Sequence, residues 1–316
     1  MRVVFMGTPD FALPSLKALV QAPDCDVVAV FTRPDAVSGR GKQLVPCPVK
    51  LAALAAGITT YQPDSFKNEE AIQTLKELSP DLIVVAAYGV ILPQDVLDIP
   101  TYGCLNVHGS LLPEYRGAAP IQRVILDGKE IAGVCIMRME AGLDTGDYCS
   151  CASVATAGMD YSQLSTELSN LGAKILIEAL PRVVDGSIEW IKQDDAKATY
   201  AHKIEKPETL LSPELTAVTN LRRVRASSAQ APAKCIICGK GVTVETAQIA
   251  LDIPKAEPGA VTISKKGVFL HCAQGALNLL AIKPDGKKRM DGRAWALGLR
   301  DVPLEWEALP AFKGAE

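Results

Sequence analysis

Residues 81–89 read DLIVVAAYG, a nearly unbroken apolar run that ends on a glycine. A run of this length without polar alternation is typical of a central strand that is buried on both faces of a parallel sheet. Helices must cover both faces of such a sheet, so strand and helix patterns should alternate on either side of this run.

That alternation is present over the first 150 residues, and one more helical pattern follows at 160–180. The β-rich runs are RVVFMG (2–7), DVVAVFT (26–32) and IAGVCIMRM (131–139), and the helical patterns include VKLAALAAG (49–57) and residues 160–180. In the last of these, leucines recur at helical spacing on one stripe. The pattern predicts a doubly wound α/β domain built on a parallel sheet.

The pattern changes near residue 194. Residues 194–214 are polar and contain two prolines, and short β-like runs separated by Gly and Pro follow. We therefore predict a first domain over 1–193, a linker over 194–208 and a small β-barrel domain over 209–316.

Composition limits the class of protein. The chain has 316 residues and is 48% hydrophobic, which allows a large core, and no stretch of about 18 apolar residues predicts a membrane span. The first residues resemble a strand and not a signal peptide. The nine cysteines are odd in number and scattered, which favours reduced thiols in a cytoplasmic protein.

The net charge of −3 is unevenly distributed. Residues 205–316 carry 16 Lys and Arg against 12 Asp and Glu, so the C-terminal part is basic and the remainder acidic. A basic C-terminal part is suited to a polyanion, although an excess this small also fits ordinary scatter.

Asn106 and His108 form the strongest local signal. They are two residues apart in an apolar strand, so both side chains point to the same face, at the end of a strand. An amide and an imidazole together can polarise a carbonyl and hold the oxyanion that forms on attack. A carboxylate to orient the His would complete the set, and spacing leaves Asp144 and Asp147 as alternatives. The simpler interpretation is that Asn106 and His108 are both polar residues of the core, whose hydrogen bonds go to the backbone.

Three other motifs carry weaker signals. The first loop, GTPDF (7–11), lacks the later glycines of a dinucleotide fingerprint, which disfavours an NAD-linked dehydrogenase. The Cys235–Cys238 pair has zinc-like spacing but no second pair, which disfavours a metal site. The long loop at 33–50 is rich in Arg, Lys, Gly and Pro, and either binds phosphates or is a solvated linker.

The stretch NVHGSLLPEYRGAAPIQ (106–122) resembles the signature of the folate-dependent formyltransferases, an Asn-x-His strand end followed by Ser-Leu-Leu-Pro and Arg-Gly. Further similar stretches occur in the same order and together extend over most of residues 1–208. They are FMGTPDFA (5–12), RPDAVSGRGKQLVPCPVK (33–50), VVAAYGVILP (84–93), GLDTGD (142–147) and YAHKIEKPE (200–208).

The resemblance implies a Rossmann-like formyltransferase domain followed by an OB-like barrel. It also implies roles for individual residues, and among the two carboxylates it selects Asp144. The implied sets are Asn106, His108 and Asp144 for catalysis; Ser110, Leu111, Leu112 and Pro113 for the folate-contacting turn; Ala87, Tyr88, Gly89, Val90, Ile91 and Leu92 for the pterin loop; and Arg40 and Lys42 for the acceptor end of a tRNA.

By the same resemblance, 10-formyltetrahydrofolate is the formyl donor and the α-amine of methionyl initiator tRNA is the acceptor. We expect a cytoplasmic monomer that needs no metal and no membrane. The alternatives are an amino-sugar N-formyltransferase, a formyltetrahydrofolate hydrolase and, less favoured, an inactive RNA-binding module. The C-terminal part departs from the family pattern, because TLLSPELTAVTNLRRVRASSAQAPAKCII (209–237) contains no Trp.

Overall fold

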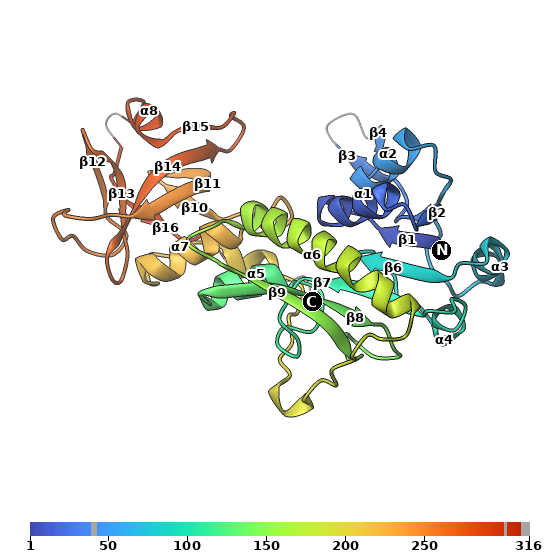
Figure 1. The fold of residues 1–316 in the computed structure, drawn as a ribbon. Helices are drawn as coiled ribbons and strands as arrows, with labels where there is room; N and C mark the ends of the chain where they lie inside the picture. Colours follow the sequence, from blue (N-terminus) through green and yellow to red (C-terminus); the bar gives the residue numbers. More distant parts are fainter. Residues whose placement is uncertain (39–42, 300–301, 311–316) are drawn as a thin grey trace. The chain divides into compact units, whose positions relative to one another are not determined.

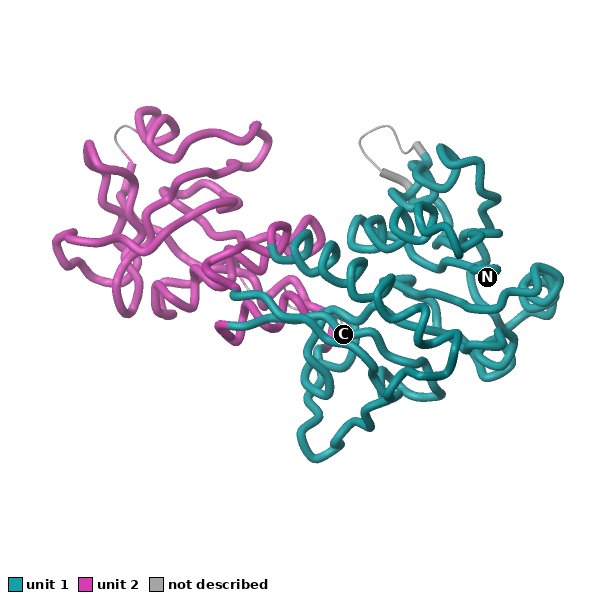
Figure 2. Tube along the Cα trace, viewed as in Figure 1, with its two compact units in different colours: residues 1–120, 131–155, 164–201 teal, residues 121–130, 156–163, 202–316 magenta. Residues whose placement is uncertain are grey.

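The structure is a computed structural model that describes residues 1–38, 43–299 and 302–310. The chain divides into two compact units, which Figure 2 distinguishes by colour. Unit 1 comprises residues 1–120, 131–155 and 164–201, and unit 2 comprises residues 121–130, 156–163 and 202–316. The stretch predicted as a linker is therefore shared between the units, since residues 194–201 belong to unit 1.

Unit 1 is an α/β unit (Figure 1). Its elements in chain order are β1 (Arg2–Gly7), η1 (Asp10–Ala12), α1 (Leu13–Gln21), β2 (Asp26–Phe31), β3 (Ala36–Ser38), β4 (Gln43–Val45), α2 (Pro48–Ala55), β5 (Thr60–Tyr61), α3 (Glu69–Leu78), β6 (Leu82–Ala86), α4 (Gln94–Leu97), β7 (Cys104–His108), β8 (Ile131–Arg138), β9 (Tyr148–Ala155), most of α6 (Tyr161–Val184) and η2 (Asp195–Lys197).

The main sheet has the strand order β5-β2-β1-β6-β7-β8-β9. The strands from β5 to β7 are parallel, which confirms the predicted α/β class, whereas β8 and β9 run antiparallel at one edge. The strand order reverses direction between β1 and β6. In open α/β sheets, ligands bind beyond the carboxyl ends of the strands at such a reversal.

Local sequence explains why these elements form. All five residues of β6 are apolar and fully or almost fully buried, as predicted for the central strand. The helix α3 has Glu69 and Glu70 in its first turn and Lys76 in its last, which suits the helix dipole. It stops at Ser79, whose φ of 46° is left-handed and cannot continue a helix.

The two faces of the sheet are covered by different helices. On one face, α3 and α4 pack on a cluster that includes Met6, Ile83 and Val85. On the other face, α6 approaches the sheet at Gly172, where a Cβ atom would lie 2.7 Å from Val107. Only a glycine allows this close approach, and Val107 therefore points away from the face that carries Asn106 and His108.

Cys135 and Cys151 form a disulfide, with 4.1 Å between their Cα atoms. They are direct partners in the antiparallel pairing of β8 with β9. The prediction of reduced thiols is therefore wrong for this pair. The register that brings the two residues together depends on the hairpin between β8 and β9, which cysteine spacing does not show.

Unit 2 contains two segments from the first half of the chain in addition to the C-terminal part. Its elements in chain order are α5 (Pro120–Asp127, from residue 121), the first turn of α6, η3 (Lys206–Thr209), α7 (Ala217–Ala226), β10 (Lys234–Ile237), β11 (Lys240–Ile249), β12 (Val261–Ser264), β13 (Gly267–His271), β14 (Ala276–Pro284), β15 (Met290–Asp291), α8 (Gly292–Ala296) and β16 (Trp306–Glu307).

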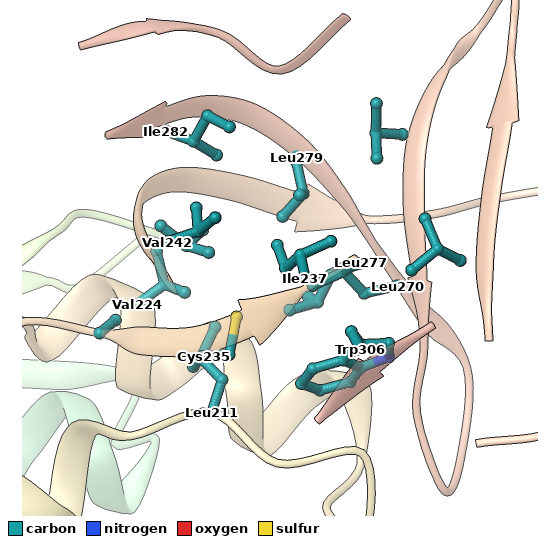
Figure 3. Close-up of a cluster of buried hydrophobic side chains, with 14 of the residues drawn as sticks. Leu211, Val224, Cys235, Ile237, Val242, Leu270, Leu277, Leu279, Ile282 and Trp306 are labelled. Atoms are coloured by element: carbon teal, nitrogen blue, oxygen red, sulfur yellow. The ribbon is translucent and has the colours of Figure 1, made fainter. Parts of the chain in front are cut away.

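The strands of unit 2 form an antiparallel, nearly closed barrel, as the short β-runs predicted. The order is β12-β13-β14-β11-β10-β16, and the bridge between Ala260 and Glu305 brings the last strand back toward the first. Figure 3 shows the apolar side chains that meet inside it, among them Leu279 and Trp306. The helix α7 adds Leu221 and Val224 to this core.

The Cys235–Cys238 pair belongs to this barrel. Cys235 is fully buried in the core, and burial raises the pKa of its thiol. Cys238 and Gly239 have φ values of 50° and 71° and form the turn between β10 and β11. Within the described ranges, no group of three or more His, Cys, Asp or Glu side chains could hold a metal ion. In the same part of the chain, no helix has both the length and the apolar character to cross a membrane.

Candidate active site

Polar groups gather where the parallel strands of unit 1 end. The loops that follow β1, β6 and β7 leave the same edge of the sheet, next to the strand-order reversal. Two of these loops are linked directly, because the Thr8 hydroxyl donates a hydrogen bond of 3.1 Å to the carbonyl oxygen of Tyr88. Thr8 also accepts a hydrogen bond from the backbone N–H of Arg33.

Asn106, His108 and Asp144 converge on one point of this edge. Asn106 donates its side-chain N–H to Oδ1 of Asp144 across 3.4 Å. Nδ1 of His108 lies 3.7 Å from Oδ2 of the same carboxylate, and the two side chains are 5% and 16% exposed. The shared face predicted for Asn106 and His108 is present, since both residues contact one carboxyl group.

The loop between β8 and β9 brings Asp144 to this point. Asp144 has a φ of 53°, a left-handed conformation that is uncommon outside glycine. Its Oδ2 accepts a hydrogen bond of 2.8 Å from the backbone N–H of Gly117. Asp147 instead uses its carbonyl oxygen, which accepts from the N–H of Arg138 in the hairpin. The structure therefore brings Asp144 to the Asn–His pair.

The ring of His108 is held from its other side. Nε2 of His108 lies 3.1 Å from the carbonyl oxygen of Tyr115, and a carbonyl can only accept, so this bond requires the proton on Nε2. Nδ1 then faces Asp144 at a distance that is too long for a direct hydrogen bond and short enough for an ion pair once the ring is protonated. In the neutral ring, Nδ1 is thus able to accept a proton.

The turn that follows β7 contains the four residues predicted to contact folate. Ser110 is buried and donates to the carbonyl oxygen of Glu114 at 2.6 Å, which closes the turn, and the Leu112–Pro113 peptide is cis. Leu112 packs on Cys135 and Met137, whereas Leu111 keeps 36% of its surface exposed. Among these side chains, Leu111 is the one that is most accessible to a ligand.

The loop predicted to hold the pterin has an unusual backbone. Ala87 and Gly89 have φ values of 46° and 79°. Tyr88 is buried in the core, where its hydroxyl has no hydrogen-bond partner among the described residues. Burial raises the pKa of this hydroxyl. Leu92 is also buried and Val90 is half-buried, but Ile91 is 91% exposed. The side chains mostly anchor this loop, which leaves its backbone and Ile91 at the surface.

Arg40 and Lys42 lie outside the described residues. The base of their loop is described, and it is a hairpin of β3 and β4 followed by α2. Lys50, in α2, forms an ion pair of 2.7 Å with Asp35, and Gln62 donates to the same carboxylate at 2.9 Å. The hydrogen bond from Lys50 lowers the pKa of Asp35 most, and the hydrogen bond from Gln62 lowers it further. The two ends of the loop are therefore tied together.

The sequence predictions missed four residues that hold Asp144 or the segments next to it. Gly117 supplies the N–H described above, and Gln193 donates to the carbonyl oxygens of Asp144 and Gly146. Arg116 is 2% exposed and donates its Nε–H to Oε1 of Gln193, while Thr199 accepts from the N–H of Tyr115. The Arg-Gly pair in the motif was the signal that could have found two of them. Gln193 and Thr199 gave no signal because they lie at the edge of, or inside, the predicted linker.

Two groups of cations in the basic C-terminal part differ in exposure. The arginines of α7 are half-buried, and Arg223 donates to the carbonyl oxygen of Leu210 close to Glu208. Lys283, Lys287, Lys288, Arg289 and Arg293 are exposed around β14 and α8, where Arg289 pairs with Glu245 at 2.8 Å. The cations around β14 and α8 are thus the more exposed group, whereas the arginines of α7 contribute to packing.

Comparison with known proteins agrees with this architecture. Residues 1–180 match the family "Formyl transferase", and residues 203–300 match "Formyl transferase, C-terminal domain". The chain is 44% identical over 309 residues to methionyl-tRNA formyltransferase of Xylella fastidiosa, covering 96% of this chain and 99% of that one. It is 45% identical over 306 residues to the Stenotrophomonas maltophilia protein of the same name, with the same coverage.

A solved structure shares the fold at low identity. HypX of Aquifex aeolicus, crystallised with tetrahydrofolic acid, superimposes with a TM-score of 0.63 at 17% identity. The match covers 94% of this chain and 47% of HypX, so this chain spans about half of that protein. With both domains matched and relatives that extend over nearly its whole length, the chain belongs to the formyl transferase family.

Proposed function

We propose that the chain transfers the formyl group of 10-formyltetrahydrofolate to the α-amine of methionyl initiator tRNA, and so produces formylmethionyl-tRNA for the initiation of translation. The observation that carries the proposal is the contact of Asn106 and His108 with one carboxylate, Asp144, at the end of β7. The relatives' names supply the acceptor, since both are called methionyl-tRNA formyltransferase.

In the proposed reaction, the amine nitrogen attacks the formyl carbon and negative charge develops on the formyl oxygen. The bond from Asn106 to Asp144 is long, and the amide has two hydrogens, so Asn106 can donate to that oxyanion. Nδ1 of His108 accepts the proton that the amine loses. The resulting imidazolium forms an ion pair with Asp144 and places a positive charge beside the oxyanion.

Collapse of the tetrahedral intermediate completes the transfer. The proton on His108 passes, directly or through water, to N10 of the folate as the bond between the formyl carbon and N10 breaks. The carbonyl re-forms on the amine, and tetrahydrofolate leaves. The hydrogen bond from Gly117 keeps the Asp144 carboxylate in place throughout, and no metal enters the proposed reaction.

The folate is proposed to lie between the loop at 87–92 and the turn at 110–113. Two observations support this position. Ile91 and Leu111 leave apolar surface exposed at the strand ends, which suits the flat face of a pterin. Ala87 and Gly89 turn the backbone of the same loop in a way that can present N–H and C=O groups to a heterocycle.

For the tRNA, we propose that Arg40 and Lys42 approach the acceptor end and that the exposed cations around β14 and α8 contact phosphates. A charged tRNA is a cytoplasmic substrate, so we place the reaction in the cytoplasm. We also propose that the chain acts as a monomer, which light scattering would test. The likeness of its barrel to an OB fold remains a prediction.

The test offers three acceptors and follows release of tetrahydrofolate from 10-formyltetrahydrofolate. We expect release with methionyl initiator tRNA, and little with free methionine or with a nucleotide-linked amino sugar. Release with the sugar alone would support the amino-sugar formyltransferase, and release without any acceptor would support the hydrolase. Arg40→Ala should slow only the reaction with tRNA, because the loop is proposed to contact only that substrate.

A further inference from the structure

Gln193 is a buried amide, 6% exposed, whose hydrogen-bonding capacity is directed at the loop that carries Asp144. Its Nε2 donates to the carbonyl oxygen of Asp144 at 2.9 Å and to that of Gly146 at 2.6 Å. Its Oε1 accepts from Nε of Arg116 at 2.9 Å. Both amide hydrogens are therefore used, and each binds a carbonyl on a different side of Thr145.

The loop needs such support because its conformation is unfavourable by itself. Asp144 has left-handed backbone angles, and residues in such regions persist when the surrounding structure holds them there. Gly146 follows so close to β8 that a Cβ atom would lie 2.0 Å from the carbonyl oxygen of Arg138. The two carbonyls that Gln193 binds thus flank the turn that sets the direction of the Asp144 side chain.

Arg116 connects this support to the other side of the same carboxylate. The residue after it, Gly117, donates its N–H to Oδ2 of Asp144. The backbone of Arg116 is fixed by hydrogen bonds of 2.9 Å to Thr199 and 2.7 Å from Ala201. The segment from 193 to 201 therefore holds both the backbone of Asp144 and the donor to its side chain.

We propose that Gln193 is a positioning residue for the reaction. Through its two donated hydrogen bonds it keeps the Asp144 carboxylate beside His108, and through Arg116 it couples that carboxylate to the Gly117 N–H. The inference rests on the proposed function for its kinetic consequence, but its structural consequence can be measured without any turnover. It also assigns a role to the residue that directly precedes the predicted linker.

Gln193→Met tests the proposal, because methionine is similarly long and unbranched but donates no hydrogen bond. Lys192→Met is the matched control, since the neighbouring Lys192 is exposed and receives the same new side chain. Gln193→Glu is the second variant. It can still accept from Arg116 but presents a carboxylate to two carbonyl oxygens, so it should be at least as damaging if the donated bonds matter.

We expect kcat to fall about 10- to 100-fold in both Gln193 variants, the range that a misplacement of about 1 Å produces, with KM for the formyl donor little changed. Hydrogen exchange of the Gly117 amide should also accelerate, because its acceptor has moved, while Lys192→Met resembles the wild type in both respects. If a Gln193 variant does not fold, the comparison uses the other one.

Unchanged exchange at Gly117 in folded Gln193 variants would overturn the proposal, as would kinetics equal to those of Lys192→Met. If the wild type transfers no formyl group to any acceptor, the proposed function is wrong. In that case, hydrogen exchange of the Gly117 amide by itself still decides whether Gln193 positions Asp144.

Discussion

The backbone N–H of Gly117 lies 2.8 Å from Oδ2 of Asp144 and joins two loops whose residues are 27 positions apart in the chain. Gly117 has a φ of 118°, and a Cβ atom there would lie 2.9 Å from the carbonyl oxygen of Ala201. The position therefore requires glycine for two reasons, its backbone angle and its close approach to the segment that frames the site.

Gly117→Ala should damage both stability and activity. The strained backbone and the close approach to Ala201 together should cost about 1–3 kcal/mol of unfolding free energy, and the displaced N–H should lower kcat. Gly186→Ala is the control, since Gly186 has a φ of 75° but open space around its Cβ position. Urea denaturation and steady-state kinetics check both effects. Equal results for the two variants would mean that only backbone strain matters at Gly117.

The three converging side chains should each be necessary for turnover. Asn106→Ala removes a donor to the oxyanion, which typically lowers kcat by about 10²–10³. We expect His108→Ala and Asp144→Asn to be at least as damaging, and the triple variant to be little worse than the worst single one, because groups that act as a unit are not additive.

Folate binding should survive in all three variants, and quenching of protein fluorescence by the folate measures it. Asp147→Asn is the control for Asp144→Asn, since the side chain of Asp147 has no assigned role in the site. Near-normal turnover by His108→Ala would contradict the proposed mechanism.

The barrel of unit 2 should lose stability in mild acid because of His271. This residue is 3% exposed, bonds Thr262 through Nε2 at 2.8 Å, and has its pKa lowered by burial. In the unfolded chain His271 binds a proton near pH 6.5, whereas in the folded chain it binds one only at a lower pH. The barrel therefore keeps its full free energy of unfolding above about pH 6.5. This free energy falls as the pH decreases toward the pKa of His271 in the folded chain.

His271→Gln should flatten that dependence, because glutamine can bond Thr262 but does not titrate in this range. Urea midpoints at pH 7.5 and pH 5.5 provide the measurement. His202→Gln serves as the control, since His202 is exposed. If the variant and the wild type lose equal stability between the two pH values, His271 is not the responsible group.

Affinity for tRNA should depend on the exposed cations of unit 2. Replacing Lys287, Lys288 and Arg293 by Ala should weaken binding, because fewer phosphates are neutralised and fewer counterions are released. The log–log dependence of affinity on salt should flatten by about 0.7–0.9 for each phosphate that the variant no longer neutralises. Filter binding of initiator tRNA across a salt series measures the slope. Lys174→Ala, in α6, is the control.

An unchanged slope in the triple variant would mean that other parts of the chain hold the tRNA. Substitutions are preferable to a truncation before residue 202, where the last segment of unit 1 ends, because that truncation would remove the partners of α5. Arg123 donates to the carbonyl oxygens of His202 and Lys203 and pairs with Glu208.

Much of the fold could be predicted from the sequence because the relevant patterns are local. The apolar run at 82–86 is a buried central strand, since only such a strand has both faces covered. Asn106 and His108 share a face because successive side chains in a strand alternate. The short β-runs after residue 230 predicted the barrel for a similar reason, since Gly and Pro mark the turns between them.

The tertiary structure decided what depends on residues far apart in the chain. Spacing could not separate Asp144 from Asp147, because the choice is made by a left-handed turn and by the N–H of Gly117. The disulfide of Cys135 with Cys151 depends on the register of β8 and β9, which no single strand specifies. Gln193 reaches the carbonyl of Asp144 across 49 positions, and the segment after it binds the backbone of Arg116, contacts that a polar stretch resembling a linker does not reveal.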